Sequence, residues 1–216
     1  MTETSTQNDE ARSDYWDNYY ASTEAIQRPL PSQFAAFVAG ELNESHRLIE
    51  FGCGSGRDSM FFSLHGHSVV GIDASERAVK HCTELAAALS LDATFEVAAI
   101  DDSDLASRFP ASKTSTVLYA RFFLHAINDD EERAFLRLAS ELTSTGDKLA
   151  VEYRTVRDSS NVKVTDAHYR RFVEPAAFQA EASEFGFDVI YAVEGYGLAK
   201  YKKDDAYVAR CILKHR

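Results

Sequence analysis

Three glycines at alternate positions follow an acidic residue in the stretch L-I-E-F-G-C-G-S-G-R-D, residues 48 to 58. The apolar run around Glu50 predicts a buried parallel strand, and Gly52, Gly54 and Gly56 predict a tight turn that leads into a helix. Glycine is needed there because the backbone visits positive φ, and because a Cβ atom would keep a ligand away from the main chain. The stretch therefore predicts a loop that cradles a cofactor.

The glycine spacing fits neither of two common nucleotide-binding motifs. A dinucleotide fingerprint G-x-G-x-x-G that starts at Gly52 needs a glycine where Arg57 stands, and one that starts at Gly54 needs a glycine where Ser59 stands. A phosphate-binding P-loop needs Gly-Lys followed by Ser or Thr, whereas Arg57 is the only basic residue nearby. The motif thus disfavours a nicotinamide oxidoreductase and a P-loop protein.

The remaining pattern, E-x-G-x-G-x-G, resembles the first motif of class I S-adenosylmethionine-dependent methyltransferases. A second apolar strand, H-S-V-V-G-I-D, ends in Asp73, seventeen residues after Gly56. An acid at the tip of the neighbouring strand can accept both ribose hydroxyls. The resemblance covers nearly the whole chain from about Asp14. It implies a Rossmann-like α/β fold with a seven-stranded, mostly parallel sheet, a C-terminal antiparallel hairpin and helices on both faces.

The resemblance implies S-adenosylmethionine as the cofactor, with Asp73 on the ribose and with the glycine loop under the methionine part, close to Glu50. Family members commonly have an acid that contacts the adenine amino group, and the stretch A-A-I-D-D leaves two registers open. Either Ala99 holds the position of that acid, or the acid has moved to Asp101, while Ile100 is expected against the adenine ring. The expected cofactor contacts are Trp16, Glu50, Gly52, Cys53, Gly54, Arg57, Asp58, Asp73, Ala74, Ile100, Asp101 and Arg121. We find no paired-acid cluster that would require a metal ion.

The fourth strand, around residues 115 to 120, runs into R-F-F-L-H-A-I. Arg121 and His125 therefore fall at the carboxyl end of the sheet, where ligands of open α/β sheets bind. One helical turn would bring both side chains to the same face. Each also has a structural interpretation: an ion pair of Arg121 with Glu152, and a histidine packed under the loop. The expected catalytic residues are Arg121, His125, Glu152, Arg154 and His168.

The segment 154–174 after the fifth strand is polar and has no clean periodicity, which suggests a substrate loop. Its cations suggest an anionic substrate, because guanidinium groups bind carboxylate or phosphate bidentately. The alternative is a solvated loop whose charges pair with Asp158, Asp166 and Glu174, although a strand end holds Arg154 in place. The cations are Arg154, Arg157, Lys163, His168, Arg170 and Arg171. The expected substrate contacts are Tyr20, Arg154, Tyr169, Arg170, Arg171 and Lys200.

Aromatic residues precede the first core strand in the stretch D-Y-W-D-N-Y-Y-A-S. The resemblance implies a helical lid over residues 14–45 that closes over cofactor and substrate, with Trp16 and Tyr20 as its foremost aromatic contacts. The alternative is a surface helix that packs its rings on the core. We expect a flexible N-terminus over residues 1–13 and a single methyltransferase domain over residues 14–216.

Length and composition favour a cytoplasmic protein that acts on a small molecule. A chain of 216 residues with 45% hydrophobic residues can build one substantial core, and it has no stretch long enough to span a membrane. The start is polar and acidic, unlike a signal peptide. The three cysteines, Cys53, Cys82 and Cys211, have no paired spacing and are predicted as free thiols. A net charge of −11 without a basic run disfavours nucleic acid. The oligomeric state stays open.

Together these features predict O-methylation of a small anionic molecule, in which arginines orient a phosphonate, phosphate-like or carboxylate oxygen. The alternative is O-methylation of a sugar or alcohol hydroxyl, with His125, His168 or Glu152 as general base. The stretches D-Y-W-D-N-Y-Y, P-S-Q-F-A, A-R-F-F-L-H-A-I, V-E-Y-R-T and H-Y-R-R-F resemble a methyltransferase subgroup associated with bacterial surface glycans and with phosphonate or phosphoramidate metabolism. A non-catalytic cofactor-binding module would have lost its polar site residues, which are abundant here.

Overall fold

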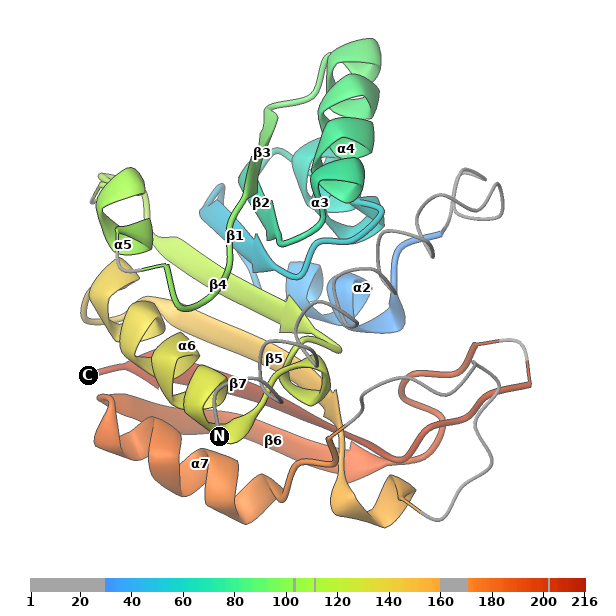
Figure 1. Cartoon of the computed structure of the whole chain (residues 1–216), viewed down its shortest axis with the longest axis vertical. Helices are drawn as coiled ribbons and strands as arrows, with labels where there is room; N and C mark the ends of the chain where they lie inside the picture. Colours follow the sequence, from blue (N-terminus) through green and yellow to red (C-terminus); the bar gives the residue numbers. More distant parts are fainter. Residues whose placement is uncertain (1–29, 103, 111, 160–170, 202) are drawn as a thin grey trace, which may run out of the picture.

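The computed structural model describes residues 30–102, 104–110, 112–159, 171–201 and 203–216, and Figure 1 shows their arrangement. The strands are β1 (Arg47–Phe51), β2 (Ser68–Asp73), β3 (Ala93–Val97), β4 (Thr116–Arg121), β5 (Lys148–Arg154), β6 (Phe187–Gly195) and β7 (Val208–His215). The helices are α2 (Gln33–Gly40), α3 (Arg57–Leu64), α4 (Glu76–Leu89), α5 (Leu105–Arg108), α6 (Asp129–Leu142) and α7 (Pro175–Glu184), with the 3-10 turns η2 (Leu124–Ala126) and η3 (Val156–Asp158). Within the described ranges, no helix has the length and apolar composition that a bilayer crossing needs.

The seven strands of the described chain form one sheet in the order β3-β2-β1-β4-β5-β7-β6. β1 pairs with β2 and β4, β2 pairs with β3, and β4 pairs with β5, all in parallel. β7 runs antiparallel to both β5 and β6, so β6 and β7 form a hairpin at one edge of the sheet (Figure 1). The predicted Rossmann-like fold, mostly parallel with a C-terminal antiparallel hairpin, is confirmed.

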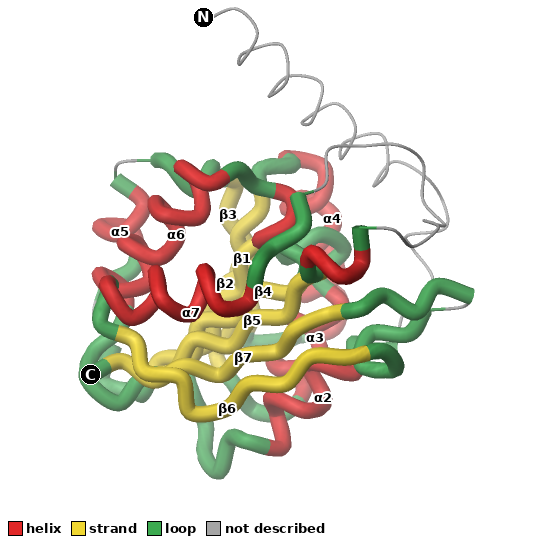
Figure 2. Tube along the Cα trace, turned by 90° about the horizontal axis from the view of Figure 1, so that it is seen from below, coloured by secondary structure: helices red, strands yellow, loops and turns green. Residues whose placement is uncertain are grey.

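Helices cover both faces of the sheet, as predicted. Figure 2 shows α5, α6 and α7 on one face and α2 and α3 on the other. The central strand β4 has five successive buried residues, since a parallel strand between two helical layers is shielded on both sides. Leu118 belongs to the core beneath α6 and α7, whereas Tyr119 belongs to the core beneath α2 and α3.

The strand order reverses at β1, which has β2 on one side and β4 on the other. The loop after β1 leads into α3 on one face, and the loop after β4 leads into α6 on the opposite face. Divergent loops of this kind leave a crevice beyond the carboxyl ends of the strands, where ligands of open α/β sheets bind. The fold thus brings the glycine loop and the end of β4 to the same edge.

A buried carboxylate joins α2 to the start of α3. Asp58 accepts hydrogen bonds from the backbone nitrogen and the hydroxyl of Ser32, both at 2.7 Å, and from the hydroxyl of Tyr119 at 2.9 Å. Ser32 is also the N-cap of α2, where its hydroxyl accepts from the Ala35 nitrogen at 2.9 Å. These contacts fix the entry to α2 against the helix that follows the glycine loop.

Removing the Tyr119 hydroxyl should destabilise this junction. We expect Tyr119→Phe to lower the free energy of unfolding by about 1.5–3 kcal/mol, because Asp58 would lose a buried, charge-assisted hydrogen bond. Chemical denaturation measures the effect. Tyr153→Phe is the matched control, since the Tyr153 ring is equally buried and its hydroxyl lies 3.9 Å from the Cys211 sulfur. Equal losses in the two variants would contradict the role assigned to the Tyr119 hydroxyl.

Candidate active site

All three glycines of the loop between β1 and α3 have left-handed backbone conformations. Their φ angles are 68° at Gly52, 52° at Gly54 and 70° at Gly56. The Gly52 nitrogen donates to the Ile72 carbonyl at 2.8 Å, which ties the loop to β2. A Cβ atom at Gly56 would lie 2.6 Å from the Cys82 sulfur of α4. Glycine is therefore required by conformation at all three positions and also by space at Gly56.

Asp73 connects the glycine loop to the tip of β2. Its two carboxylate oxygens accept from the Gly54 nitrogen at 2.8 Å and from the Ser75 nitrogen at 2.9 Å. Ser75 is the N-cap of α4. Asp73 is half-buried, whereas Gly52 and Ala74 are exposed at the ends of β1 and β2. This edge of the sheet therefore offers a carboxylate and open main chain next to each other.

Glu50 and Asp58 lie buried beneath the loop. The Ser59 hydroxyl donates to the Glu50 carboxylate. Burial, reinforced by the nearby charge of Asp58, raises the pKa of Glu50 well above its ordinary value. One Asp58 oxygen accepts from the Ser32 nitrogen, and the other accepts from the hydroxyls of Ser32 and Tyr119. Asp58 therefore has a positioning role, and its expected contact with the cofactor stays a prediction. Arg57 is half-buried, with its Nε 3.5 Å from Asp58.

The predicted free thiols are confirmed, because Cys53, Cys82 and Cys211 are all unpaired and buried. Cys53 lies within the glycine loop, and the Cys82 thiol donates to the Gly54 carbonyl at 3.2 Å. A hydrogen bond with Cys82, together with burial, raises the pKa of Cys53 well above its ordinary value. The thiols of Cys53 and Cys82 fill space at the glycine loop, and only 6% of the Cys53 surface is exposed to solvent.

The adenine side begins where β3 ends at Val97. The Ala98 nitrogen donates to the Asp73 carbonyl at 3.1 Å, and the chain then turns through a bond from the Asp102 nitrogen to the Ala99 carbonyl at 3.2 Å. Ala99 and Asp101 are both exposed, so either register of the expected acid is compatible with this turn. Ile100 is half-buried against the larger core, and its contact with adenine stays a prediction.

A row of three charges crosses the ends of β4, β5 and β7. Glu152 is 0% exposed and lies directly opposite Arg121 on one side and Arg210 on the other. Its oxygens accept from the Arg121 Nε at 2.8 Å and from the Arg210 Nε at 2.7 Å. The alternative interpretation of Arg121, an ion pair with Glu152, is therefore confirmed. A carboxylate held in this way is poorly placed to act as a general base.

The predicted helical turn between Arg121 and His125 is wrong. β4 stays extended through Arg121, and the Phe122 nitrogen still donates to the Glu152 carbonyl of β5 at 2.7 Å. Phe122 then adopts φ 57° before the 3-10 turn η2, because the pairing with β5 delays the helical conformation. His125 is buried within η2, with its ring 5.1 Å from the ring of Phe122.

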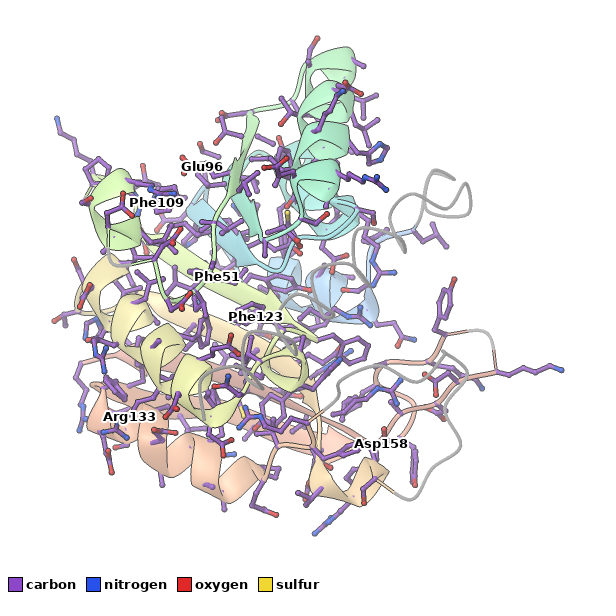
Figure 3. All side chains as sticks on the ribbon, viewed as in Figure 1. Phe51, Glu96, Phe109, Phe123, Arg133 and Asp158 are labelled. Atoms are coloured by element: carbon purple, nitrogen blue, oxygen red, sulfur yellow. The ribbon has the colours of Figure 1, made fainter. Side chains whose placement is uncertain are left out.

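Arg154 does not extend toward open solvent. Its guanidinium donates to Asp158 at 2.6 Å and also to Asp204, and its side chain is only 8% exposed. Asp158, which Figure 3 labels, is fully buried and also accepts from the Tyr207 nitrogen at 2.9 Å. The alternative interpretation, in which charges of this segment pair with nearby acids, therefore holds at Arg154, since the fold surrounds it with two carboxylates.

The remaining expected site residues divide into three groups. Arg171 donates to Asp129 and Glu132, and its backbone nitrogen donates to the His125 carbonyl at 2.9 Å, so the protein's own acids occupy its guanidinium. Lys200 is exposed, and its backbone nitrogen donates to the Gln33 side chain of α2 at 3.2 Å. Five expected residues lie outside the described ranges: Trp16, Tyr20, His168, Tyr169 and Arg170. Their roles, and most of the expected lid, stay predictions.

Sequence reasoning missed Arg210 and Phe122. Arg210 stands in the apolar run V-A-R-C-I-L, and a charged residue inside a buried strand is a signal that could have been read. The left-handed conformation of Phe122 has no such signal, because neither Gly nor Asn marks the position.

Comparisons with known proteins agree with this geometry. Residues 48–146 match the model of a family described as a methyltransferase domain. A protein from a structural study of the conversion of a disulfide bond into a thioacetal group during echinomycin biosynthesis has a TM-score of 0.70 and 18% identity, with 94% of this chain and 92% of that chain covered. A TehB-like SAM-dependent methyltransferase from Corynebacterium glutamicum has a TM-score of 0.68 and 12% identity, with 96% and 100% covered. No curated protein gives a significant sequence match.

A third solved structure, magnesium protoporphyrin IX methyltransferase from Synechocystis with bound SAH, has a TM-score of 0.63 and 16% identity, with 85% of this chain and 80% of that chain covered. Part of the chain therefore matches a methyltransferase domain, and its fold is the fold of these solved methyltransferases. The sequence resemblance implies S-adenosylmethionine as the cofactor of this site, and the Synechocystis enzyme has also been solved with SAM bound. The residues fit this group, since the left-handed glycines leave the main chain accessible at Gly52 and Asp73 offers an acceptor at the tip of β2.

The buried Glu50 predicts a specific pH dependence of stability. Its folded pKa is raised, so from about pH 4.5 upward the folded protein keeps a proton that the unfolded chain has lost. The free energy of unfolding should then fall by about 1.4 kcal/mol per pH unit until the folded pKa is reached. The Glu50→Gln variant has no ionisable group at this position, so it lacks this pH dependence. We expect the variant to gain stability relative to the wild type as pH rises from 4.5 to 8, measured by urea denaturation without cofactor. A difference that does not change with pH would contradict the assignment.

Arg154→Ala should act on stability. Removing the guanidinium leaves the buried Asp158 without its cation, which we expect to lower the free energy of unfolding by about 3–5 kcal/mol. Arg157→Ala is the matched control, because Arg157 is 62% exposed in its pair with Glu194 and should lose at most about 1 kcal/mol. Chemical denaturation of both variants measures the two losses in the free energy of unfolding. An Arg154→Ala protein of wild-type stability that binds only its acceptor poorly would restore the substrate role.

Proposed function

We propose that the enzyme transfers a methyl group to an oxygen of a small anionic molecule, such as a phosphonate, a phosphate-like group or a carboxylate. The observation that carries the proposal is the placement of Arg121. It ends β4 at the ligand edge of the sheet, and Glu152 engages its Nε. Its two terminal nitrogens have no hydrogen-bond partner among the described residues, and its side chain is 15% exposed. This leaves one edge of the guanidinium available for an anion.

The local charge balance supports an anionic acceptor. Glu152 neutralises only one of the two guanidinium groups that flank it, so the row of Arg121, Glu152 and Arg210 has one positive charge in excess. The protein as a whole carries a net charge of −11, and the positive excess is confined to this row, because Asp158 and Asp204 outweigh Arg154 beside it. A small anion would be attracted to the row, whereas the overall charge disfavours nucleic acid.

The chemistry requires positioning above all. S-adenosylmethionine supplies a methyl group bound to a positively charged sulfur. Displacement in line needs the acceptor oxygen about 3 Å from the methyl carbon, on the side opposite the sulfur. An oxygen that is already anionic needs no general base, so Arg121 would only have to hold it in place. The sequence resemblance makes a phosphorus oxyanion or an acidic sugar the first acceptors to test.

A hydroxyl acceptor would place a different demand on the site, since it needs a base. Glu152 is unsuited, because both of its oxygens accept from arginines and it has no exposed surface. Of the other two candidate bases, His125 is buried beside Phe122, and His168 lies outside the described residues. The anionic acceptor therefore agrees better with the residues at this edge.

A methyl-transfer screen tests the proposal. The purified protein is given labelled S-adenosylmethionine and a panel that pairs phosphonates and carboxylates with neutral sugars and alcohols, and the products are identified by mass. We expect methylation of anions only. Arg121→Gln should raise the KM for the preferred anion about tenfold, because a charge-assisted hydrogen bond is lost, and should leave the Kd for S-adenosylhomocysteine unchanged. Methylation confined to neutral hydroxyls would refute the anionic acceptor and favour His125 or His168 as a general base.

A further inference from the structure

We propose that Phe122 is a positioning residue that orients the guanidinium of Arg121 toward the acceptor. The inference deepens the proposed function, on which it rests for the acceptor-binding role of Arg121. It begins with a backbone conformation. Phe122 has φ 57°, in the left-handed region that costs a bulky L-residue about 1–2 kcal/mol. Ser90, with φ 53°, also has this conformation, but it ends α4 as a C-cap, where the left-handed region is common.

Phe122 has no helix end to explain its conformation, so its surroundings must hold it there. Its backbone nitrogen donates to the Glu152 carbonyl at 2.7 Å, which carries the pairing of β4 and β5 one residue beyond the strand. The same glutamate binds the Arg121 Nε through its side chain. One residue of β5 thus fixes both Arg121 and the backbone of Phe122.

The left-handed turn changes where the ring lies. In a regular strand, neighbouring side chains point to opposite faces of the sheet. Here the Cζ atom of Arg121 lies over the Phe122 ring, 4.1 Å from its centroid. The next residue, Phe123, lies beside Phe51 (Figure 3). Their ring centroids are 6.2 Å apart, and a Cβ atom at Gly52 would lie 2.9 Å from the Phe123 ring. Adjacent phenylalanines therefore serve the two halves of the site, Phe122 beside Arg121 and Phe123 beneath the cofactor loop.

The Phe122 ring is itself held from behind. The Arg154 Cζ lies 5.6 Å from the ring centroid, and Asp158 and Asp204 fix that guanidinium. The ring also packs against a small cluster in the β6–β7 connection and the start of β7, formed by Leu198, Ala199, Ala206 and Val208. The ring therefore gives Arg121 a rigid surface. The buried ion pairs of Arg154 contribute to this rigidity by holding the Phe122 ring in place.

Two contacts orient the Arg121 guanidinium. Glu152 binds it at one edge, and Phe122 covers one face. Because a guanidinium is planar, an edge contact and a face contact together determine the direction of its terminal nitrogens. An arginine oriented before binding loses less conformational freedom when it binds an anion. Loss of the aromatic face should therefore weaken the acceptor and leave the cofactor unaffected.

Variants of the two neighbouring phenylalanines test this assignment. We expect Phe122→Leu, which keeps apolar bulk but removes the aromatic face, to raise the KM for the anionic acceptor about tenfold. The Kd for S-adenosylhomocysteine should stay within about twofold of the wild type, and Phe122→Tyr should restore the KM. Phe123→Leu, in contrast, should weaken S-adenosylhomocysteine more than the acceptor. Equal weakening of cofactor and acceptor by Phe122→Leu, or an unchanged KM, would overturn the assignment.

A second measurement does not depend on the acceptor. The NMR signal of the Arg121 Nε–H should carry a ring-current shift from Phe122, which Phe122→Leu abolishes and Phe122→Tyr retains. If the signal responds in this way while the wild type methylates no anion, the positioning by Phe122 stands and the proposed function fails. If Phe122→Leu leaves the signal unchanged, the positioning itself is refuted, whichever acceptors the enzyme accepts.

Discussion

The carboxylate of Glu152 holds the ligand edge of this enzyme together. A buried carboxylate without cations would cost several kcal/mol, so Arg121 and Arg210 must stay beside it, and with them the register of β4, β5 and β7. Arg210 also donates to the Leu198 carbonyl, and its Cζ atom lies 5.4 Å from the centroid of the Phe34 ring in α2. One buried negative charge thus joins three strands, the connection between β6 and β7, and the helix on the neighbouring face.

The two halves of the site are built by different means. The cofactor side depends on main-chain geometry, with left-handed glycines and an aspartate that accepts from backbone nitrogens. The proposed acceptor side depends on side-chain charges and rings at the ends of β4 and β5. Main-chain geometry tolerates few substitutions, whereas side chains at strand ends can change one at a time. A fold of this kind can therefore keep its cofactor while its acceptor varies.

The features that sequence predicted well are local. The glycine loop, Asp73 and the strand pattern follow from rules about adjacent residues, and the structure has them in place. The error at Arg154 concerns a residue with a distant partner, because Asp204 lies fifty residues away in the chain. Only the folded topology brings such groups together. The turn at Phe122 was missed because pairing with β5 overrides the local helical tendency.

The thiols of Cys53 and Cys82 can report local opening of the glycine loop. Cys53 and Cys82 are buried, and hydrogen bonding and burial raise the pKa of Cys53, so alkylating reagents meet neither sulfur while the loop is closed. Modification then requires local opening of the segment that joins β1 to α3. The alkylation rate of these native cysteines therefore reports how often the glycine loop opens, and the measurement needs no engineered label.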